Sequence, residues 1–239
     1  MIVAGIVFRR VLRAKRTWAL GLLPALAVVV AFLAASQSGN TRAAYGSYVI
    51  GLLFPIVVAL VSWVIAASAV TDEREELTIL YVAQTPVSRL RTAAEIWLSA
   101  WAASMVLIAL PLVMGIVLAG RAGVSAQAQI DLVVASALAS AAYCGLGVLA
   151  AFYTKRAAVI GLIYVLLWES VMSGFAEGAK NLSVTQHARA IAARSADPWT
   201  RMELHPPTTS AGVALVVLVG IVAGSVLLAG RRFRRMNMP

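Results

Sequence analysis

Six long apolar stretches constrain the fold of this chain more than any other feature of its sequence. A helix needs about 20 mostly apolar residues to cross the hydrocarbon core of a bilayer. Backbone that faces lipid must satisfy its own hydrogen bonds, so each stretch predicts a helix and not an irregular segment. The six predicted spans cover approximately residues 18–35, 48–70, 93–119, 130–152, 157–176 and 210–230.

The composition requires much of this apolar surface to face lipid. Hydrophobic residues make up 61% of the chain and charged residues only 13%, whereas a soluble domain is about 25% charged. A soluble fold of this length cannot bury so much apolar surface. The sequence therefore predicts an all-α fold, a polytopic bundle of six transmembrane helices that forms a single transmembrane domain over residues 1–239.

The basic residues predict how the bundle is oriented, because Lys and Arg are enriched on the cytoplasmic side of membrane proteins. Alternate connections are rich in them: Arg9, Arg10, Arg13, Lys15, Arg16, Arg74, Arg89, Arg91, Lys155, Arg156, Arg231, Arg232, Arg234 and Arg235. The remaining connections hold only Arg42, Arg121, Lys180, Arg189, Arg194 and Arg201. Both termini are therefore expected in the cytoplasm, with the chain in the inner (plasma) membrane of a bacterium. Because the basic residues lie in short clusters beside the spans, the net charge of +10 does not indicate nucleic-acid binding.

The first seventeen residues predict an amphipathic helix that lies in the plane of the membrane. Val3, Val7 and Val11 recur at helical spacing on one face, with arginines on another. A basic tail that only fixes the topology is the alternative. A cleaved signal peptide is a third interpretation, since Ala34 and Ala35 precede a serine. The first apolar run is longer than the about 7–15 residues of a signal core, which argues against cleavage.

No pattern of catalytic or metal-binding residues occurs in the chain. There is no phosphate-binding glycine loop and no zinc-protease motif. The histidines, His187 and His205, lie in one connection and are too few for a metal site, so they are expected at the surface. The single cysteine, Cys144, is expected to be a small buried residue. The chain is therefore predicted to be no enzyme and to bind no metal or cofactor.

Two features inside the spans are candidates for function or packing. Glu169 lies about twelve residues into the fifth span, where a charge is costly and must face the bundle, a partner or a water-filled cavity. A structural hydrogen bond, a substrate contact and a position nearer the outer surface all remain open for it. Gly220 and Gly224 form a G-x-x-x-G pattern in the last span, which lets two helix backbones approach closely.

The outer connection, residues 177–209, predicts a short helix. Ser183 and Gln186 fit a capping box, in which both side chains satisfy free amides at a helix start. The helix is expected to end near Ser195, before Asp197 and Pro198 stop it. Its apolar side would lie in the outer interface of the membrane.

The cytoplasmic connection, residues 71–92, has acidic residues at its start and arginines at its end. This asymmetry suits a short helix, whose N-terminus favours carboxylates, although a solvated loop with scattered charges is the alternative. The residues of interest are Glu73, Arg74, Glu75, Glu76, Thr78, Pro86, Ser88 and Arg89.

At this segment the sequence resembles the permease subunits of ABC type-2 exporters. An acidic stretch (Glu73–Glu76), Thr78 and a Pro-x-Ser-Arg ending (Pro86–Arg89) match the family, and Leu77 stands where many members have glycine. The fifth span region, from Trp168-Glu169 to Leu182-Ser183, is also similar to bacterial members, including those tied to nitrous-oxide reductase maturation.

The resemblance implies that the cytoplasmic segment docks on a separate ABC ATPase subunit, which would bind ATP and magnesium and hydrolyse the ATP. It further implies a second permease copy, or a related permease, with lipid around the pair. The expected function is ATP-driven export by alternating access. A secondary active transporter, a membrane-embedded enzyme and a non-transporting membrane assembly subunit are the alternatives. An apolar pathway suits lipids, drugs or peptides equally, so the substrate stays open.

Overall fold

The apolar sequence forms helices throughout the part of the chain that the structure describes. In this computed structural model the described residues are 5, 15–37, 40–75, 88–172, 182–206 and 209–235, and none of them forms a strand. In chain order the helices are α2 (Lys15–Gln37), α3 (Thr41–Tyr48), η1 (Val49–Val58), α4 (Ala59–Glu75), α6 (Arg89–Arg121), α7 (Ala126–Tyr153), α8 (Ala157–Ile163), η2 (Tyr164–Met172), α11 (Val184–Ala192), α12 (Pro198–Leu204) and α13 (Ala211–Arg235). The elements η1 and η2 are π-helical.

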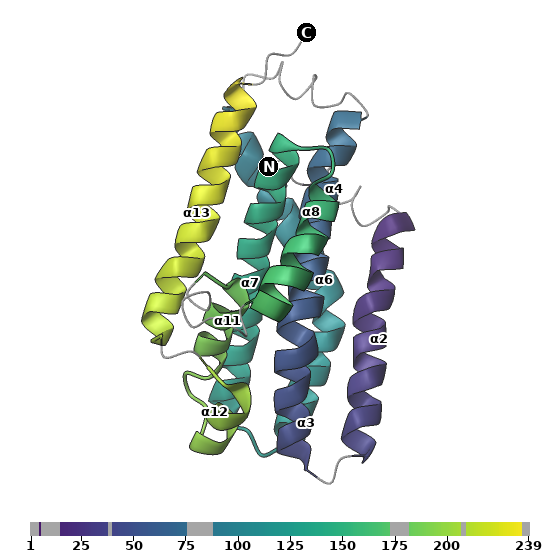
Figure 1. Ribbon diagram of the computed structural model, residues 1–239, viewed down its shortest axis with the longest axis vertical. Helices are drawn as coiled ribbons and strands as arrows, with labels where there is room; N and C mark the ends of the chain where they lie inside the picture. The colour runs from purple at the N-terminus through teal and green to yellow at the C-terminus, as the bar shows by residue number, and fades with distance from the viewer. Residues whose placement is uncertain are drawn as a thin grey trace.

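The long helices run side by side along the long axis of the bundle (Figure 1). Helix α2 begins and α13 ends at one end of the bundle, which we call the N/C end. Helix α3 begins and α12 lies at the other end, which we call the α12 end. Helix α7 lies at the centre and contacts α4, α6, α8, α11 and α13.

Four of the six predicted spans are helices long and apolar enough to cross a membrane. They are Thr41–Thr71, Arg89–Arg121, Ala126–Tyr153 and Ala211–Arg234. The first and fifth predicted spans are represented by shorter apolar helices, Gly21–Leu33 and Ala157–Glu169. The predicted in-plane helix over residues 1–17 falls almost wholly outside the described residues.

Small residues let α4 and α7 pack closely. A side chain at Gly147 of α7 would come within 2.8 Å of the Trp63 carbonyl oxygen, so this glycine is required for the backbone approach. Ser62, Ser104 and Ser140, from α4, α6 and α7, hydrogen-bond through their hydroxyl groups at 2.8 and 2.9 Å. The Cys144 thiol lies beside them, 3.4 Å from the Ser62 carbonyl oxygen, and is fully buried as expected. We call these four residues the serine cluster.

Large apolar side chains point outward from the bundle along several helices. Leu22 and Leu26 of α2 are 71% and 64% exposed, and Val216 of α13 is 71% exposed. A soluble protein rarely leaves so continuous an apolar surface uncovered. The exposed side chains therefore fit helices that face lipid.

Candidate functional site

The fifth pass of the chain through the bundle is not one continuous helix. It is formed by α8 with η2 and then by the separate helix α11, and Glu169 lies near the end of η2. Helices α8 and η2 enter from the N/C end and pack against Trp63 of α4. The Trp63 indole donates to the Ala157 carbonyl oxygen at 3.0 Å and stacks on Tyr164 with ring centroids 5.4 Å apart. Gly161 lies against the indole, where any side chain would overlap it. These contacts fix the position of η2 along the axis of the bundle, and with it the position of Glu169.

Helix α11 lies on the same route, between Glu169 and the α12 end. It runs alongside α7 and also contacts α13 (Figure 1). Near its start, Thr185 hydrogen-bonds the Tyr143 hydroxyl at 2.9 Å, about 25 Å along α7 from its first residue. Just beyond its end, the Ser195 amide donates to Asp131 at 3.1 Å, about 8 Å along α7. Helix α11 therefore extends from deep inside the bundle toward the α12 end.

This position differs from the expected place of the helix in the outer interface. Its apolar residues and also Thr185, Gln186 and His187 are buried, so both faces pack inside the protein. Ser183 caps the helix as predicted, accepting from the Gln186 amide at 3.2 Å. The helix ends at Ala192, and Asp197 with Pro198 begins α12 instead of stopping a helix.

Four donors converge on the buried carboxylate of Glu169, which is only 3% exposed. The Val184 amide and the Tyr164 hydroxyl donate to Oε1 at 3.0 and 3.2 Å. The Thr185 amide donates to Oε2 at 3.3 Å, and the Ser183 hydroxyl donates to the same oxygen. We call Glu169, Tyr164, Ser183, Val184 and Thr185 the Glu169 site.

The donors of the Glu169 site explain how a charge is accommodated at this depth. The first amides of a helix have no partner within it, and the helix N-terminus carries a partial positive charge. The Glu169 carboxylate satisfies two of these amides in α11. An isolated buried carboxylate is costly, but one that accepts several hydrogen bonds is stabilised. Of the alternatives left open for Glu169, the geometry fits a structural hydrogen bond.

A second buried charge lies on α11 itself. Arg189 donates from Nη2 to the Ile50 carbonyl oxygen of η1 at 3.2 Å. Its Nε is buried and makes no hydrogen bond with any described residue. Helix α11 is thus attached to η2 through Glu169 and to η1 through Arg189.

Polar contacts join α12 to α3 at the α12 end. Asp197 caps α12 by accepting from the Thr200 amide at 2.8 Å. Hydrogen bonds from the side chain and the backbone of Thr200 lower the pKa of Asp197 below its usual value, and the attraction of Arg42 adds to this effect. Arg42 lies 3.9 Å from Asp197 and donates to the Ala122 carbonyl oxygen at 3.0 Å.

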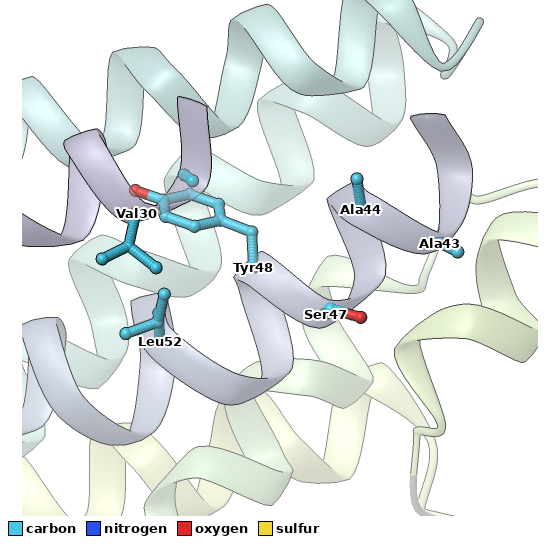
Figure 2. Close-up of a pocket in the computed structure, with 7 residues that line it drawn as sticks. Val30, Ala43, Ala44, Ser47, Tyr48 and Leu52 are labelled. Atoms are coloured by element: carbon cyan, nitrogen blue, oxygen red, sulfur yellow. The ribbon is translucent and has the colours of Figure 1, made fainter. Parts of the chain in front are cut away.

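Two hollows lie near this end of the bundle. One, of about 360 Å³, is lined by residues of α11, α12 and the start of α13, among them Arg194 and Arg201. The other, of about 250 Å³, is an apolar crevice between α2 and the α3–η1 helix. Figure 2 shows Val30, Tyr48 and Leu52 around this crevice. The first hollow borders α11, whereas the crevice lies apart from the Glu169 site.

The residues predicted to dock on a partner are described only in part. Glu73, Arg74 and Glu75 lie in the last turn of α4. Glu76, Thr78 and Pro86 fall outside the described residues. Ser88 caps α6, where it accepts from the Arg91 amide.

Arg89 attaches the start of α6 to the end of α13. Its Nη1 donates to the Phe233 carbonyl oxygen at 2.8 Å, and its guanidinium lies 5.3 Å from the centre of the Phe233 ring. Gly230 packs against Leu90 in the same region. The end of the connection over residues 71–92 is therefore joined to the last helix of the bundle.

Gly220 and Gly224 make no close contact within the described chain. A side chain added at either glycine would meet nothing within 4 Å. Their predicted role in helix packing concerns a partner helix and stays a prediction.

Two site features were missed in the sequence. Asp131 is buried near the start of α7 and accepts a hydrogen bond from the Ser195 amide. His187 is buried, with Nδ1 2.8 Å from the Ser183 carbonyl oxygen, although it was expected at the surface. Asp131 contacts the connection that folds back into the bundle, and His187 belongs to it; span patterns alone do not reveal this fold.

Among the described residues, no cluster of His, Cys, Asp or Glu side chains could hold a metal ion. In comparisons with known proteins, the chain matches no protein-family model and no curated sequence.

Proposed function

We propose that this chain is the membrane-spanning permease subunit of an ATP-driven ABC exporter, in which α11 closes the α12 end of the pathway. In this proposal a separate ATPase docks at the N/C end, and two permease copies, or this chain with a related one, form the pathway. The substrate moves by alternating access. The N/C end faces the cytoplasm, and the α12 end faces outward.

The observation that supports this proposal is the interrupted fifth pass with its buried carboxylate. Discontinuous helices whose N-termini meet a charged group deep in the membrane are common in transporters. Irregular backbone at this depth is stable only where protein or a water-filled cavity surrounds it. Helix α11 begins at the Ser183 cap and packs on α7 and α13, and polar contacts of Glu169 join it to η2, so it can separate from η2 without unfolding a span.

The contacts of Arg89 support a route for motion from a docked ATPase. In the segment that resembles the docking region, Ser88 caps α6 and Arg89, at the end of the segment, binds the end of α13. A displacement of this segment therefore acts on two long helices together. Helix α13 contacts α11 directly, so the displacement reaches the outward closure through one further contact.

The distribution of charge supports the orientation. Lys155, Arg156, Arg231 and Arg234 lie at the N/C end and are exposed. Basic residues beside spans favour the cytoplasmic side. The opposite end has fewer basic residues, and one of them, Arg42, lies beside an acidic side chain.

Purification of the full chain from its native host in mild detergent tests the partner. We expect an ATPase in stoichiometric amount, identified by mass spectrometry. Changing Glu75 and Glu76 to Ala removes two acidic residues from the docking segment and should lower the ATPase-to-permease ratio about ten-fold. An exposed ion pair is worth about 0.2–1 kcal/mol, so two pairs at about 0.7 kcal/mol each account for a ten-fold change. The control is Glu177→Ala with Glu203→Ala, which removes two acidic residues from the outer connection.

An equal ratio in the two variants would mean that the segment does not dock the ATPase. Absence of any ATPase, under conditions that preserve comparable complexes, would overturn the proposal as a whole. A secondary active transporter would then become the leading function, with Glu169 as its intramembrane charge.

A further inference from the structure

A basic surface at the N/C end is formed by two segments that are far apart in the sequence. One is the turn between α7 and α8, and the other is the last turn of α13. The surface consists of Lys155, Arg156, Arg231, Arg232 and Arg234, of which all but Arg232 are exposed. Neither residues 150–160 nor residues 226–239 contain Asp or Glu. The surface is therefore positive without a local counter-charge from its own segments.

Aromatic side chains hold the two segments together. The Arg232 guanidinium lies 5.0 Å from the centre of the Tyr153 ring. The rings of Phe152 and Phe233 pack with their centroids 5.4 Å apart. Arg89 further anchors this end of α13 by donating to Phe233. The basic residues are thus arranged by packed contacts between α6, α7 and α13.

The basic surface borders apolar side chains that face away from the bundle. Val159 and Ile160 follow the α7–α8 turn and are 54% and 46% exposed, and Leu227 and Leu228 precede the α13 arginines at 48% and 46%. Tyr153 at the border is 61% exposed. Exposed Tyr beside apolar residues on one side and Lys or Arg on the other marks the level of lipid headgroups.

We propose that this surface binds the phosphate headgroup of an anionic membrane lipid in the cytoplasmic leaflet. Clusters of Lys and Arg immediately beyond a spanning helix attract anionic lipids, and guanidinium groups bind phosphate oxygens through two hydrogen bonds. The apolar border favours a lipid over the acidic face of a soluble protein, because the acyl chains can lie along Val159, Ile160, Leu227 and Leu228. The site requires only that the bundle spans a membrane and does not depend on the exported substrate.

The lipid can stabilise a particular arrangement of three helices. A headgroup bound by both segments bridges the α7–α8 turn to the end of α13, which Arg89 already joins to α6. We therefore expect bound lipid to raise the resistance of the bundle to heat.

The test is native mass spectrometry of the full chain in detergent, titrated with phosphatidylglycerol and, separately, phosphatidylcholine of the same acyl chains. The variant is Arg156→Gln with Arg231→Gln, one residue from each segment. The matched control is Arg121→Gln with Arg194→Gln, two exposed arginines at the α12 end. A second variant, Arg156→Lys with Arg231→Lys, keeps the charge and controls for folding.

We expect the wild type to bind phosphatidylglycerol more tightly than phosphatidylcholine. The Gln variant should lose about ten-fold or more in affinity for phosphatidylglycerol, since each basic residue near an anionic membrane contributes substantially to binding. The α12-end control should stay within about two-fold of the wild type, and the Lys variant, which keeps the charge but loses the paired guanidinium hydrogen bonds, should lose less affinity than the Gln variant.

Equal affinity of the wild type for the two lipids would overturn the proposal. Equal losses of phosphatidylglycerol affinity in the Gln variant and the α12-end control would overturn it too. If the Gln variant keeps its lipid but loses a co-purifying ATPase, the surface docks a protein and the lipid proposal is wrong. That last outcome would leave the proposed export function standing, so the two failures are distinguishable.

Discussion

The bundle contains two buried polar clusters that are built in opposite ways. The serine cluster is neutral, and its hydroxyl groups join α4, α6 and α7, three helices that run without interruption through this region. The Glu169 site centres on a carboxylate and joins η2 to the first amides of α11. Both are buried, but only the Glu169 site lies where one pass of the chain through the bundle is divided between two short helices.

This difference indicates which cluster can take part in a conformational change. A hydrogen bond between helices in a membrane contributes only about 0.6 kcal/mol on average, so the serine cluster adds little beyond close packing. A carboxylate at the same depth must keep its donors or meet water, because a buried charge without partners is costly. The Glu169 site can therefore open only if water replaces its donors, whereas the neutral serine cluster carries no such requirement.

The largest expected effect is that of Glu169→Ala, which removes the acceptor from the Glu169 site. The Ser183 hydroxyl and the Val184 and Thr185 amides would lose their partner, and each buried donor left without one costs about 1–3 kcal/mol. Because water can partly replace the carboxylate, we expect a net loss of about 3 kcal/mol in the free energy of unfolding. Thermal unfolding of the purified chain in detergent measures it.

Glu169→Gln is the conservative comparison for Glu169→Ala. Gln keeps one acceptor but turns a donor toward groups that themselves donate, so its loss should lie between zero and that of Glu169→Ala. A loss for Glu169→Ala no larger than that for a serine of the neutral cluster would contradict the comparison.

The next effect concerns how the Glu169 site is positioned. Gly161→Ala places a methyl group where it overlaps the Trp63 indole. Overpacking of this kind costs about 1–3 kcal/mol, so we expect a loss of about 2 kcal/mol, measured by the same unfolding experiment.

Gly220→Ala is the matched control for Gly161→Ala, because its side chain would meet nothing within 4 Å in the described chain. Unfolding of the monomer should not become easier. If Gly220 packs against a partner helix, the change should instead weaken self-association, which can be measured by light scattering. A comparable loss of monomer stability at both glycines would show that the Trp63 contact is not special.

Ser140→Ala should have a smaller effect. The Ser140 hydroxyl hydrogen-bonds both Ser62 and Ser104, but neutral bonds between membrane helices are weak. We expect a loss of about 1 kcal/mol or less in the free energy of unfolding. A loss of about 3 kcal/mol would mean that the two clusters contribute equally and that charge does not distinguish them.

The smallest expected effect is the dependence of the stability of α12 on pH. The pKa of Asp197 is lowered in the folded protein by Thr200 and Arg42. Its contribution to stability is therefore complete above the unfolded value of about 3.9 and is lost as the pH falls through the lower folded pKa. Since Asp197 is exposed and its pair with Arg42 is screened, the loss should be below about 1 kcal/mol.

Hydrogen exchange of the α12 amides between pH 5 and pH 3 measures this loss, with Asp197→Asn as the control. In that variant the capping oxygen remains but the titration disappears. Equal pH dependence in the variant would assign the effect to another group.

The sequence could predict the long helices because apolar length is sufficient evidence for a span. It also located Glu169 as an unusual charge and Ser183 as a helix cap. It could not predict that the two residues meet, because their contact depends on residues 184–192 folding back into the bundle. The apolar side of that short segment suits a membrane surface as well as a protein interior.

The charged residues of the connections show the same limit. Asp131 lies near the start of a span, where a charged side chain can reach water, but it is buried and binds the chain beyond α11. Asp197 and Pro198 read as a helix stop, but the same pair also begins a helix, as it does in α12. The sequence patterns therefore predicted which segments form helices, but not which of these segments contact one another.

Locking α11 to α7 tests the central claim that α11 moves when the complex turns over. In a Cys144→Ser background, Asp131→Cys with Ser195→Cys introduces thiols where α7 meets the chain beyond α11, and a short bis-thiosulfonate reagent joins them. Ser62→Cys with Ser140→Cys provides a lock within the serine cluster as the comparison. The ATP turnover of the reconstituted complex is measured before and after each lock. We expect only the α11 lock to stop turnover and a reductant to restore it; full turnover with α11 locked would show that α11 does not move during the cycle.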